Sequence, residues 1–248
     1  MEALSCRLLA WEVGDGPTNM AADEALVRTA AESGIASLRF YGWRPATLSL
    51  GYFQASAARH SEARLAALPF VRRPSGGAAL VHDQEITYAL AIPPAAMRHS
   101  GGPWMAQMHG IIAQALVASG IPRGLAPVPD GTVVARGKVL CFQQCTPGDL
   151  LCDGHKVVGS AQRKYCRALL QHGAILLGTS EHACVLPGLQ ELTGRRLPVD
   201  MVCAAIAHAF SQQTRWQLRP DEWTEQERAV VASLARDKYG STEWNERR

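Results

Sequence analysis

The stretch "DLLCDGHKVVGSAQRKYCRALLQHGAILLG", residues 149–178, decides the fold. Asp153-Gly154 lies between two apolar segments, and this dipeptide in that setting is the strongest short signal for a tight β-hairpin. The segment that follows, residues 167–178, is typical of a further strand. We therefore predict a hairpin whose returning strand carries Lys156 just after the turn, followed by another strand.

Upstream of the hairpin, the sequence indicates one helix and several short strands. Residues 17–33 place apolar side chains at helical spacing, with Thr18 as the expected N-terminal cap and two acidic residues near the positive end of the helix. Residues 36–54 indicate two strands broken by a proline turn. Residues 69–94 indicate strand, glycine loop, strand, polar turn and strand.

Three further segments have a helical pattern. Residues 102–121 carry one apolar stripe and reach Gly120 as a C-terminal stop. Residues 199–210 and 221–239 are the two helices that close the chain.

This order of elements lacks the regular strand-helix-strand alternation of a doubly wound sheet. We predict an α+β fold with a mixed, mostly antiparallel sheet packed with helices. Residues 1–212 are expected to form the catalytic domain, and residues 213–248 a C-terminal helical extension packed on it.

Composition excludes several classes of protein. The chain has 248 residues and a formal net charge of +3, too mild for nucleic-acid binding. No apolar run approaches the roughly 18 residues that a membrane helix needs, and the start lacks a signal-peptide pattern, so we expect a cytoplasmic protein. Seven cysteines, an odd count, indicate reduced thiols. Cys141, Cys145 and Cys152 complete no familiar ligand set, so no metal is expected.

Two groups of basic residues stand out locally. Arg72-Arg73 and the set Arg163, Lys164 and Arg167 could form a positive rim that speeds encounter with an acidic partner. The alternative is an ordinary solvated face.

The glycine loop is a candidate binding loop. Ser75, Gly76 and Gly77 combine a hydroxyl with a backbone that a ligand can approach closely, and two arginines precede them while His82 follows. The loop lacks the lysine and third glycine of the common nucleotide-binding motifs. A tight structural turn would explain the two glycines equally well.

Single residues leave several alternatives open. Lys156 could point inward as a base or acyl-carbonyl donor, or be a surface lysine. Cys141 could be a nucleophile or a small buried hydrophobe. His172 could line a pocket or lie at a strand edge, and we interpret His109 as a core histidine with its hydrogen bonds satisfied. Ser160 lacks the context of a serine-hydrolase nucleophile.

Taken together, these segments resemble the biotin and lipoate protein ligase superfamily, from about residue 5 to 210. The resemblance rests on "NMAADEAL", "LRFYGWRPATLSLGYFQ", "RRPSGGAALVHDQEITYAL", "GHKVVGSAQRK" and "LLQHGAILL", in this order. Within that superfamily the chain is most similar to the cysteine-type octanoyltransferases of lipoate biosynthesis, through "HDQEITYA" and Cys141-Phe142.

The resemblance implies an octanoyltransferase that needs no cofactor. It implies that Cys141 takes the octanoyl group as a thioester and that Lys156 positions the acyl carbonyl or acts as acid and base. The residues that it implies for the acyl pocket are Arg72, Ser75, Gly76, Gly77, His82, Gly159, Ser160, Ala161, His172 and Gly173.

The sequence departs from this family at a few positions. Ala78 replaces the third glycine of the loop, and "CTPGDLL" replaces the usual run between the cysteine and the hairpin. Cys145 and Cys152 are therefore reserve thiols. The alternatives are an ATP-dependent lipoate-protein ligase or a non-catalytic module that binds an acyl group or its carrier.

Partners also follow from the resemblance. It implies octanoyl-acyl carrier protein as donor, and a lipoyl-domain protein or glycine-cleavage H protein as acceptor. Neither nucleic acid nor membrane is expected as a partner, and we expect a monomer.

Overall fold

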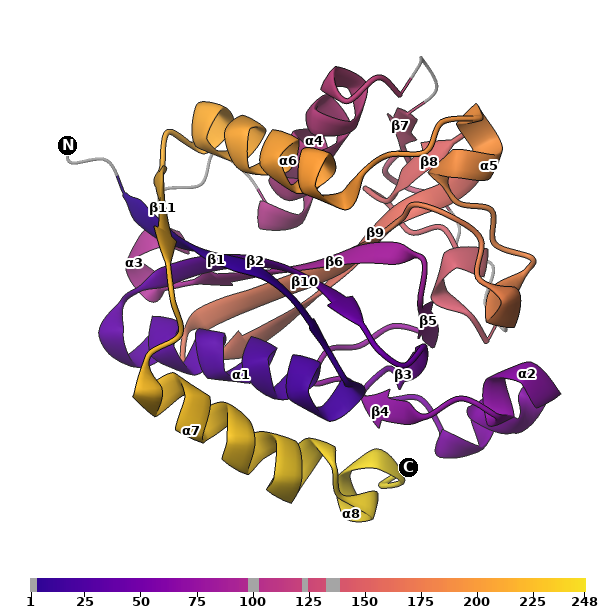
Figure 1. The fold of residues 1–248 in the computed structure, drawn as a ribbon, viewed down its shortest axis with the longest axis horizontal. Helices are drawn as coiled ribbons and strands as arrows, with labels where there is room; N and C mark the ends of the chain where they lie inside the picture. Colours follow the sequence, from indigo (N-terminus) through magenta and orange to yellow (C-terminus); the bar gives the residue numbers. More distant parts are fainter. Residues whose placement is uncertain (1–3, 98–102, 122–124, 133–138) are drawn as a thin grey trace.

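A computed structural model describes residues 4–97, 103–121, 125–132 and 139–248. Within these residues an eight-stranded sheet has the order β11-β1-β2-β6-β10-β9-β8-β7, and a small sheet, β4-β3-β5, lies beside it (Figure 1). The strands are β1 Ser5–Gly14, β2 Ala36–Trp43, β3 Thr47–Leu50, β4 Phe70–Arg72, β5 Leu80–His82, β6 Glu85–Ile92, β7 Leu125–Pro127, β8 Leu150–Cys152, β9 His155–Tyr165, β10 Ala168–Leu176 and β11 Gln217–Asp221.

Helices cover both faces of the large sheet. In Figure 1, α1 and α7 lie on one face, and α4 and α6 lie on the other. The helices are α1 Gly16–Ser33, α2 Ala63–Ala66, α3 Pro94–Met97, α4 Trp104–Ala118, α5 Leu189–Thr193, α6 Val199–Thr214, α7 Glu225–Leu234 and α8 Thr242–Asn245. No helix in the described ranges is both long and apolar enough to cross a bilayer.

The large sheet is mixed but mostly antiparallel, which confirms the fold class predicted from the sequence. β1 pairs in parallel with β2 and β11, whereas the remaining neighbours pair antiparallel. β2 and β6 are buried along their whole length because helices cover both of their faces.

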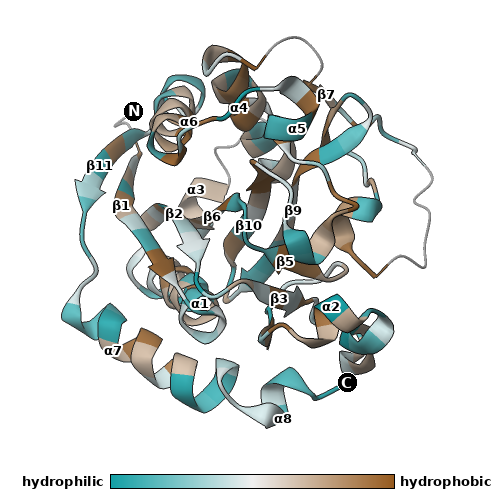
Figure 2. Ribbon diagram, turned by 45° about the vertical axis from the view of Figure 1, so that its right-hand side comes forward, coloured by the Kyte–Doolittle hydropathy of each residue, from teal (hydrophilic) through white to brown (hydrophobic). Residues whose placement is uncertain are grey.

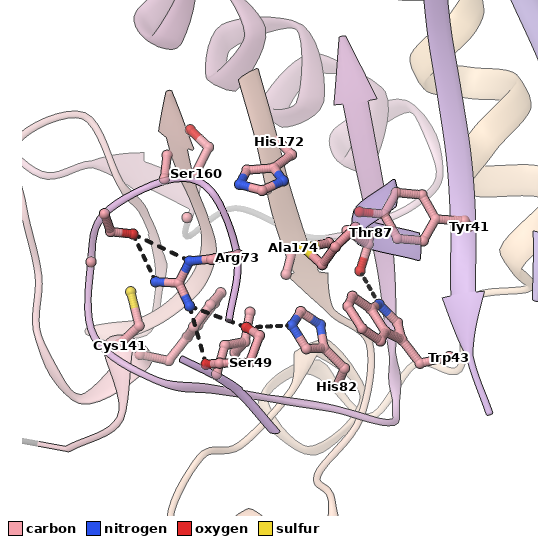
Figure 3. Close-up of a pocket in the computed structure, with 18 residues that line it drawn as sticks. Tyr41, Trp43, Ser49, Arg73, His82, Thr87, Cys141, Ser160, His172 and Ala174 are labelled. Carbon is pink, nitrogen blue, oxygen red and sulfur yellow. Dashed lines mark hydrogen bonds between the residues drawn. The ribbon is translucent and has the colours of Figure 1, made fainter. Parts of the chain in front are cut away.

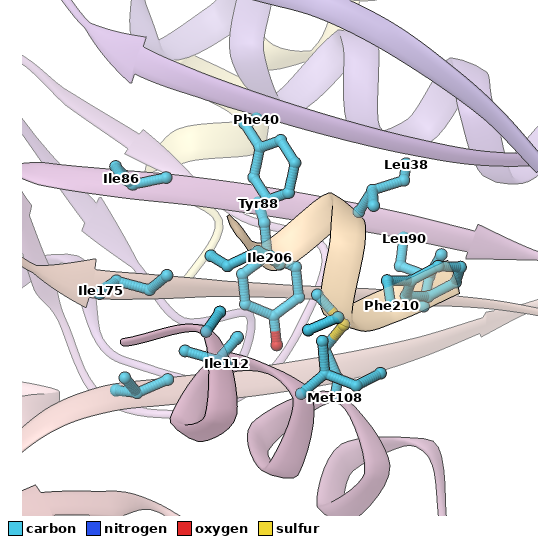
Figure 4. Packing of buried hydrophobic residues seen from close by; sticks show 14 of the residues in the cluster. Leu38, Phe40, Ile86, Tyr88, Leu90, Met108, Ile112, Ile175, Ile206 and Phe210 are labelled. Atoms are coloured by element: carbon cyan, nitrogen blue, oxygen red, sulfur yellow. The ribbon is translucent and has the colours of Figure 1, made fainter. Parts of the chain in front are cut away.

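The largest part of the core lies between the sheet and helices α4 and α6. Phe40 and Tyr88 project from β2 and β6 toward Met108 of α4 and Phe210 of α6 (Figure 4). Figure 2 shows the hydrophobic colour along inner strands such as β10, and alternating hydrophilic and hydrophobic colours along the outer helix α7. This two-sided burial holds the strands that carry the candidate site.

The hairpin predicted at Asp153-Gly154 is confirmed. Both turn residues have positive φ, 47° and 79°, as a two-residue turn of type I′ requires. The next turn, Cys166-Arg167, also has positive φ at both positions, 43° and 70°, although neither residue favours it. Strong antiparallel pairing of β9 with β10 on either side imposes that conformation.

The start of α1 differs from the prediction. Asp15 caps the helix by accepting a hydrogen bond from the Thr18 amide at 2.9 Å, so the prediction of Thr18 as the cap is wrong. The two acidic residues expected near the positive end, Asp23 and Glu24, lie in the third turn instead, and both are buried. Asp23 contacts Tyr41 and His172 of the sheet, and Glu24 contacts Lys238 and Tyr239 as well as Arg28 of α1 itself. Packing rather than the helix dipole therefore accounts for the two acidic residues.

The last part of the chain also contains a strand that was not expected. Residues 217–221 return to the large sheet as β11, and α7 begins only at Glu225, with Thr224 as its cap. Arg7 of β1 donates to Glu227 of α7 at 2.8 Å, and both side chains are buried. The division of the chain near residue 212 stays a prediction.

Replacing Glu227 with Gln should destabilise the fold in a pH-dependent way. Burial alone would raise the pKa of Glu227, but hydrogen bonds from Arg7 and Thr224 hold it below its ordinary value. The carboxylate therefore stabilises the fold fully above its unfolded pKa of about 4.3, and this contribution is lost as pH falls through the lower folded pKa. We expect a loss of about 3 kcal/mol at neutral pH.

Urea unfolding of both proteins between pH 7 and pH 3 measures this effect. The two stabilities should converge at the acid end of the range. Glu225→Gln is the matched control, because Glu225 is exposed in the same helical turn and should cost less than about 1 kcal/mol. A Glu227→Gln cost independent of pH would contradict the prediction.

Candidate active site

A cavity of about 70 Å³ lies where the large sheet meets the small one. Its walls are mainly apolar. Figure 3 shows Cys141 and Arg73 at one side of it and Tyr41, Trp43 and Thr87 at the opposite side. The lining residues are Met20, Tyr41, Trp43, Ser49, Arg73, Gly76, Gly77, Leu80, His82, Thr87, Cys141, Phe142, Gly159, Ser160, Ala161, His172, Gly173 and Ala174.

Lys156 and Cys141 meet beside this cavity. The Lys156 ammonium nitrogen Nζ lies 3.7 Å from Cys141 Sγ and 2.7 Å from Asp149 Oδ2. It also donates to the Gln144 carbonyl at 3.3 Å. Lys156 and Asp149 are both buried, so the surface alternative for Lys156 is wrong.

Asp149 is fixed by its own turn. Its Oδ2 accepts hydrogen bonds from the Thr146 amide at 2.7 Å and from the Thr146 hydroxyl at 2.8 Å. A buried ammonium without a counter-charge would be strongly destabilising. The Asp149 carboxylate supplies that counter-charge and so stabilises Lys156 in its buried position. Together, the three groups form a line from carboxylate to ammonium to thiol.

Cys141 is held by the end of the glycine loop. Its amide donates to the Ala79 carbonyl at 2.7 Å, and the Ala79 amide donates to the Val139 carbonyl at 3.0 Å. Cys141 then opens a short 3-10 turn, Cys141–Gln143, and stays half-buried. The two loops are therefore joined into one wall of the cavity.

Arg73 shapes the glycine loop from inside. Its guanidinium donates to the carbonyls of Gly76 and Ala78 at 2.8 and 2.7 Å, and to Ser49 Oγ at 3.1 Å. Burial lowers the pKa of Arg73, and the neighbouring charge of Cys141 opposes that shift. Gly77 has φ of 95°, which glycine adopts readily.

Histidines on two strands line the cavity with both ring nitrogens engaged. His172 Nδ1 faces Asp23 Oδ2 at 2.8 Å, and its Nε2 faces the Ser75 hydroxyl at 2.5 Å. His82 lies between Glu85 and Ser49, with 2.8 Å from Nε2 to the Ser49 hydroxyl.

His109 lies just behind the cavity wall. Its Nδ1 faces the Gly148 carbonyl at 2.6 Å, and its Nε2 faces the Ser160 hydroxyl at 2.8 Å. Burial lowers the pKa of His109, which favours the neutral ring. A neutral ring suits these partners, because Nδ1–H can donate to the carbonyl while Nε2 accepts from the hydroxyl. The interpretation of His109 as a satisfied core histidine is confirmed.

The structure brings most of the predicted site residues together. Those that line the cavity are Cys141, Gly76, Gly77, His82, Gly159, Ser160, Ala161, His172 and Gly173. Lys156 and Ser75 stand behind the lining, each in contact with a lining residue. His172 lies in the cavity wall, as one of its two alternatives predicted.

Arg72 does not reach the cavity. Its guanidinium is fully buried and donates to the carbonyls of Gly51, Gln54 and Asn245 at 2.9, 2.6 and 2.9 Å. Arg73 is buried as well, so the prediction that Arg72-Arg73 form a positive rim is wrong. Two neighbouring arginines in a loop can donate hydrogen bonds to buried backbone carbonyls, and their charge alone does not distinguish this role from a surface role. The second basic set is exposed as predicted: Arg163, Lys164 and Arg167.

The other candidate thiols are placed differently. Cys152 is buried in the core on β8, and burial raises the pKa of its thiol, which disfavours a reactive thiolate. Cys145 is half-buried.

Sequence reasoning missed Asp149 as a partner of Lys156. The sequence carried only part of the signal, because counting back from the Asp153-Gly154 turn pairs residue 149 with residue 158. A register shift between Leu150 and Leu151 places Asp149 beside Gly159 and the lysine instead. It also missed the far end of the cavity, where α1, β2 and β6 contribute Met20, Tyr41, Trp43 and Thr87. Those side chains meet only in the tertiary fold.

Comparison with known proteins identifies relatives across the whole chain. Residues 15–186 match the family model described as the lipoyl protein ligase A/B catalytic domain. "Octanoyltransferase LipM" of Geobacillus kaustophilus is 32% identical over 269 residues, covering 93% of this chain and 94% of the relative. "Octanoyltransferase LipM" of Moorella thermoacetica is 32% identical over 280 residues, covering 100% of each.

Solved structures share the fold. One comes from an archaeal lipoylation system of Thermoplasma acidophilum, a bi-partite lipoate protein ligase and its E2 lipoyl domain. It covers 99% of this chain and 97% of its own, with a TM-score of 0.70 and 21% sequence identity.

Gly159→Ala should push the Lys156 ammonium away from Cys141. A Cβ at position 159 would overlap Lys156 Cε and stand 2.9 Å from Nζ. Because a nearby cation favours the thiolate, we expect alkylation of Cys141 by iodoacetamide to slow several-fold at neutral pH. Mass spectrometry of the Cys141 peptide measures the rate.

The control for this change is Gly110→Ala. A Cβ at position 110 meets open space on the exposed side of α4, so this variant should gain about 0.5–1 kcal/mol of stability and keep the alkylation rate. Equal rates in the two variants would show that the lysine does not depend on the space at Gly159.

Proposed function

The chain belongs to the lipoyl protein ligase A/B catalytic-domain family, and on that premise we propose how it acts as an octanoyltransferase. It moves an octanoyl group from acyl carrier protein, through a thioester on Cys141, to a lysine of a lipoyl-domain protein. Relatives named octanoyltransferase over nearly the whole chain support this class of reaction. The observation that carries the residue assignment is the 3.7 Å contact between Lys156 Nζ and Cys141 Sγ beside an apolar cavity.

In the first half-reaction the Cys141 thiolate attacks the carbonyl carbon of the donor thioester. The bond from carbon to the donor sulfur breaks, and a new thioester forms on Cys141. The departing thiolate takes a proton from the Lys156 ammonium, which becomes a neutral amine. One thioester replaces another, so the step needs no ATP.

In the second half-reaction the neutral amine of the acceptor lysine attacks the Cys141 thioester. An amide bond forms, the carbon–sulfur bond breaks, and Cys141 leaves as a thiolate. The proton lost by the acceptor nitrogen goes to the Lys156 amine, which restores the ammonium beside the thiolate. Asp149 holds this side chain in one place through both steps.

The glycine loop is the proposed oxyanion site. Arg73 binds the Gly76 carbonyl, and in a trans peptide the following amide, that of Gly77, points the opposite way. Gly77 lines the cavity, and its N–H is the group that we propose for binding the oxygen of a tetrahedral intermediate. The apolar walls beyond it take the acyl chain.

Cys141→Ser should abolish thioester capture and leave the fold intact. With octanoyl-acyl carrier protein and no ATP, the native protein should gain one octanoyl group through a bond that hydroxylamine cleaves. We expect transfer by the variant to fall by several orders of magnitude, since the nucleophile is lost. Intact-protein mass spectrometry and octanoylation of a lipoyl domain are the measurements.

Cys145→Ser is the control and should keep the native rate. Undiminished transfer by Cys141→Ser would move the chemistry to another group. Activity that requires ATP would identify a ligase, and the absence of both thioester and transfer would identify a binding module.

Asp149→Asn should slow both half-reactions by about tenfold or more, because the buried ammonium loses its counter-charge. In a Lys156→Ala background the same change should have little further effect, since Asp149 acts through the lysine. Single-turnover rates of thioester formation and of transfer measure both. Thermal unfolding of each variant fixes a temperature at which all are folded.

Asp153→Asn is the matched control for that carboxylate. It lies on the exposed hairpin turn with φ of 47°, a conformation that asparagine tolerates, and should keep native rates. Additive losses for Asp149→Asn and Lys156→Ala would mean that Asp149 has a role independent of the lysine.

A further inference from the structure

Two aromatic residues stand beside the glycine loop at the outside of the molecule. Tyr52 donates its amide to the Ser75 carbonyl at 2.8 Å, and Phe53 is 68% exposed. The Phe53 ring lies 3.9 Å from where a Cβ on Gly76 would stand. Since Gly76 lines the cavity, this aromatic pair borders the loop that forms the cavity wall.

Three guanidinium groups surround the Tyr52 ring. Those of Arg163, Arg247 and Arg248 lie 5.4, 4.8 and 5.6 Å from its centroid, and Arg248 is also 5.3 Å from the centroid of Phe53. All three arginines are exposed. Arg163 belongs to β9, two residues beyond the cavity-lining Ala161. We call Tyr52, Phe53, Arg163, Arg247 and Arg248 the collar.

The fold brings these cations together without neutralising them. The nearby Glu246 pairs with Arg59 at 3.7 Å, and none of the three collar arginines has an ion pair in the described part of the chain. Arg72 anchors the preceding segment by binding the Asn245 carbonyl. Burial and the charges of Arg247 and Arg248 lower the pKa of Arg72, a sign of the positive field at this place.

Three like charges around one ring repel one another unless a partner brings negative charge. Arginine presents a planar fork that suits phosphate and carboxylate, and exposed aromatic rings add contact area. Lys164 near the end of β9 and Arg167 in the turn after it are also exposed. The collar therefore suits an acidic protein surface with an anionic group at its centre.

The donor and the acceptor are the two candidate partners, and the charge of the group that each presents to Cys141 distinguishes them. The acceptor presents a lysine, whose positive charge the collar would repel on its way to Cys141. The donor presents an arm joined to its protein by a phosphodiester, whose negative charge the collar attracts. We propose that the collar docks the acidic, phosphopantetheine-bearing donor carrier protein, a proposal that rests on the octanoyl transfer proposed above.

A triple variant, Arg163→Gln with Arg247→Gln and Arg248→Gln, tests the docking. Thioester formation on Cys141 is measured with octanoyl-acyl carrier protein, octanoyl-coenzyme A and octanoyl-pantetheine. We expect kcat/KM to fall about tenfold or more with the carrier protein and to stay within about twofold with octanoyl-pantetheine. For the native protein, the value with carrier protein should also fall with added salt, and the variant should lose this dependence.

A second triple variant controls for net charge. Arg195→Gln, Arg196→Gln and Arg219→Gln remove the same charge from exposed positions between α5 and α6 and on β11, and should keep native rates with every donor. If kcat/KM with the carrier protein fell equally in the two triple variants, long-range charge attraction alone would explain the loss. That result would overturn the docking site.

Other outcomes also overturn the proposal. If kcat/KM fell equally with octanoyl-pantetheine, the collar would act by shaping the cavity. If it fell equally with octanoyl-coenzyme A, the collar would recognise a phosphate group and not the carrier protein. A defect confined to transfer from the preformed thioester to a lipoyl domain would assign the collar to the acceptor. Unchanged rates with carrier protein would remove any role in docking.

A binding measurement keeps the test independent of the chemistry. Calorimetric titration of the protein with unacylated holo-carrier protein should give binding that the collar variant loses by about tenfold and the control variant keeps. Equal binding by all three proteins would overturn the docking site. If no donor forms a thioester, the octanoyl transfer fails while the binding result still decides on the collar.

Discussion

The buried ion pair between Asp149 and Lys156 is the interaction on which the site depends. A lysine placed among apolar strands needs a fixed counter-charge, and Asp149 supplies one that its own turn holds rigidly. The hairpin then aims the ammonium at Cys141, and the missing side chain at Gly159 leaves room for it. Turn, glycine and ion pair together fix one nitrogen relative to one sulfur.

The rest of the fold places the loop that carries Cys141 beside the Lys156 ammonium nitrogen. Cys141 comes from a loop with little secondary structure of its own, so its place depends on hydrogen bonds to Ala79 and on the carbonyl clamp of Arg73. Arg72 performs the same kind of clamping toward the C-terminal segment. Arginine suits this work because one planar group can satisfy several buried carbonyls at once.

Sequence predicted local structure well and spatial partners poorly. The Asp153-Gly154 turn has a strong local signal and was predicted correctly, whereas Cys166-Arg167 turns only because two paired strands force it. β11 is short and polar, and its existence depends on the edge of β1, which no local pattern reveals. The glycine loop and both cavity histidines were found by their residue types and by resemblance to a family. The burial of Arg72 and Arg73 was missed because a charged pair indicates a surface unless the carbonyls that surround it are known.

The histidines bear on the fate of the proposed thioester. A thioester at Cys141 has to outlast encounter with water and still react with an amine, so a general base near it would be harmful. His172, His82 and His109 could each act as such a base if a ring nitrogen were free. In each ring, however, Nδ1 faces an oxygen acceptor and Nε2 faces a serine hydroxyl. These hydrogen bonds hold the rings in the walls of the cavity. In the proposed mechanism, proton transfer belongs to Lys156, whose neutral amine appears only after the donor thiol has departed.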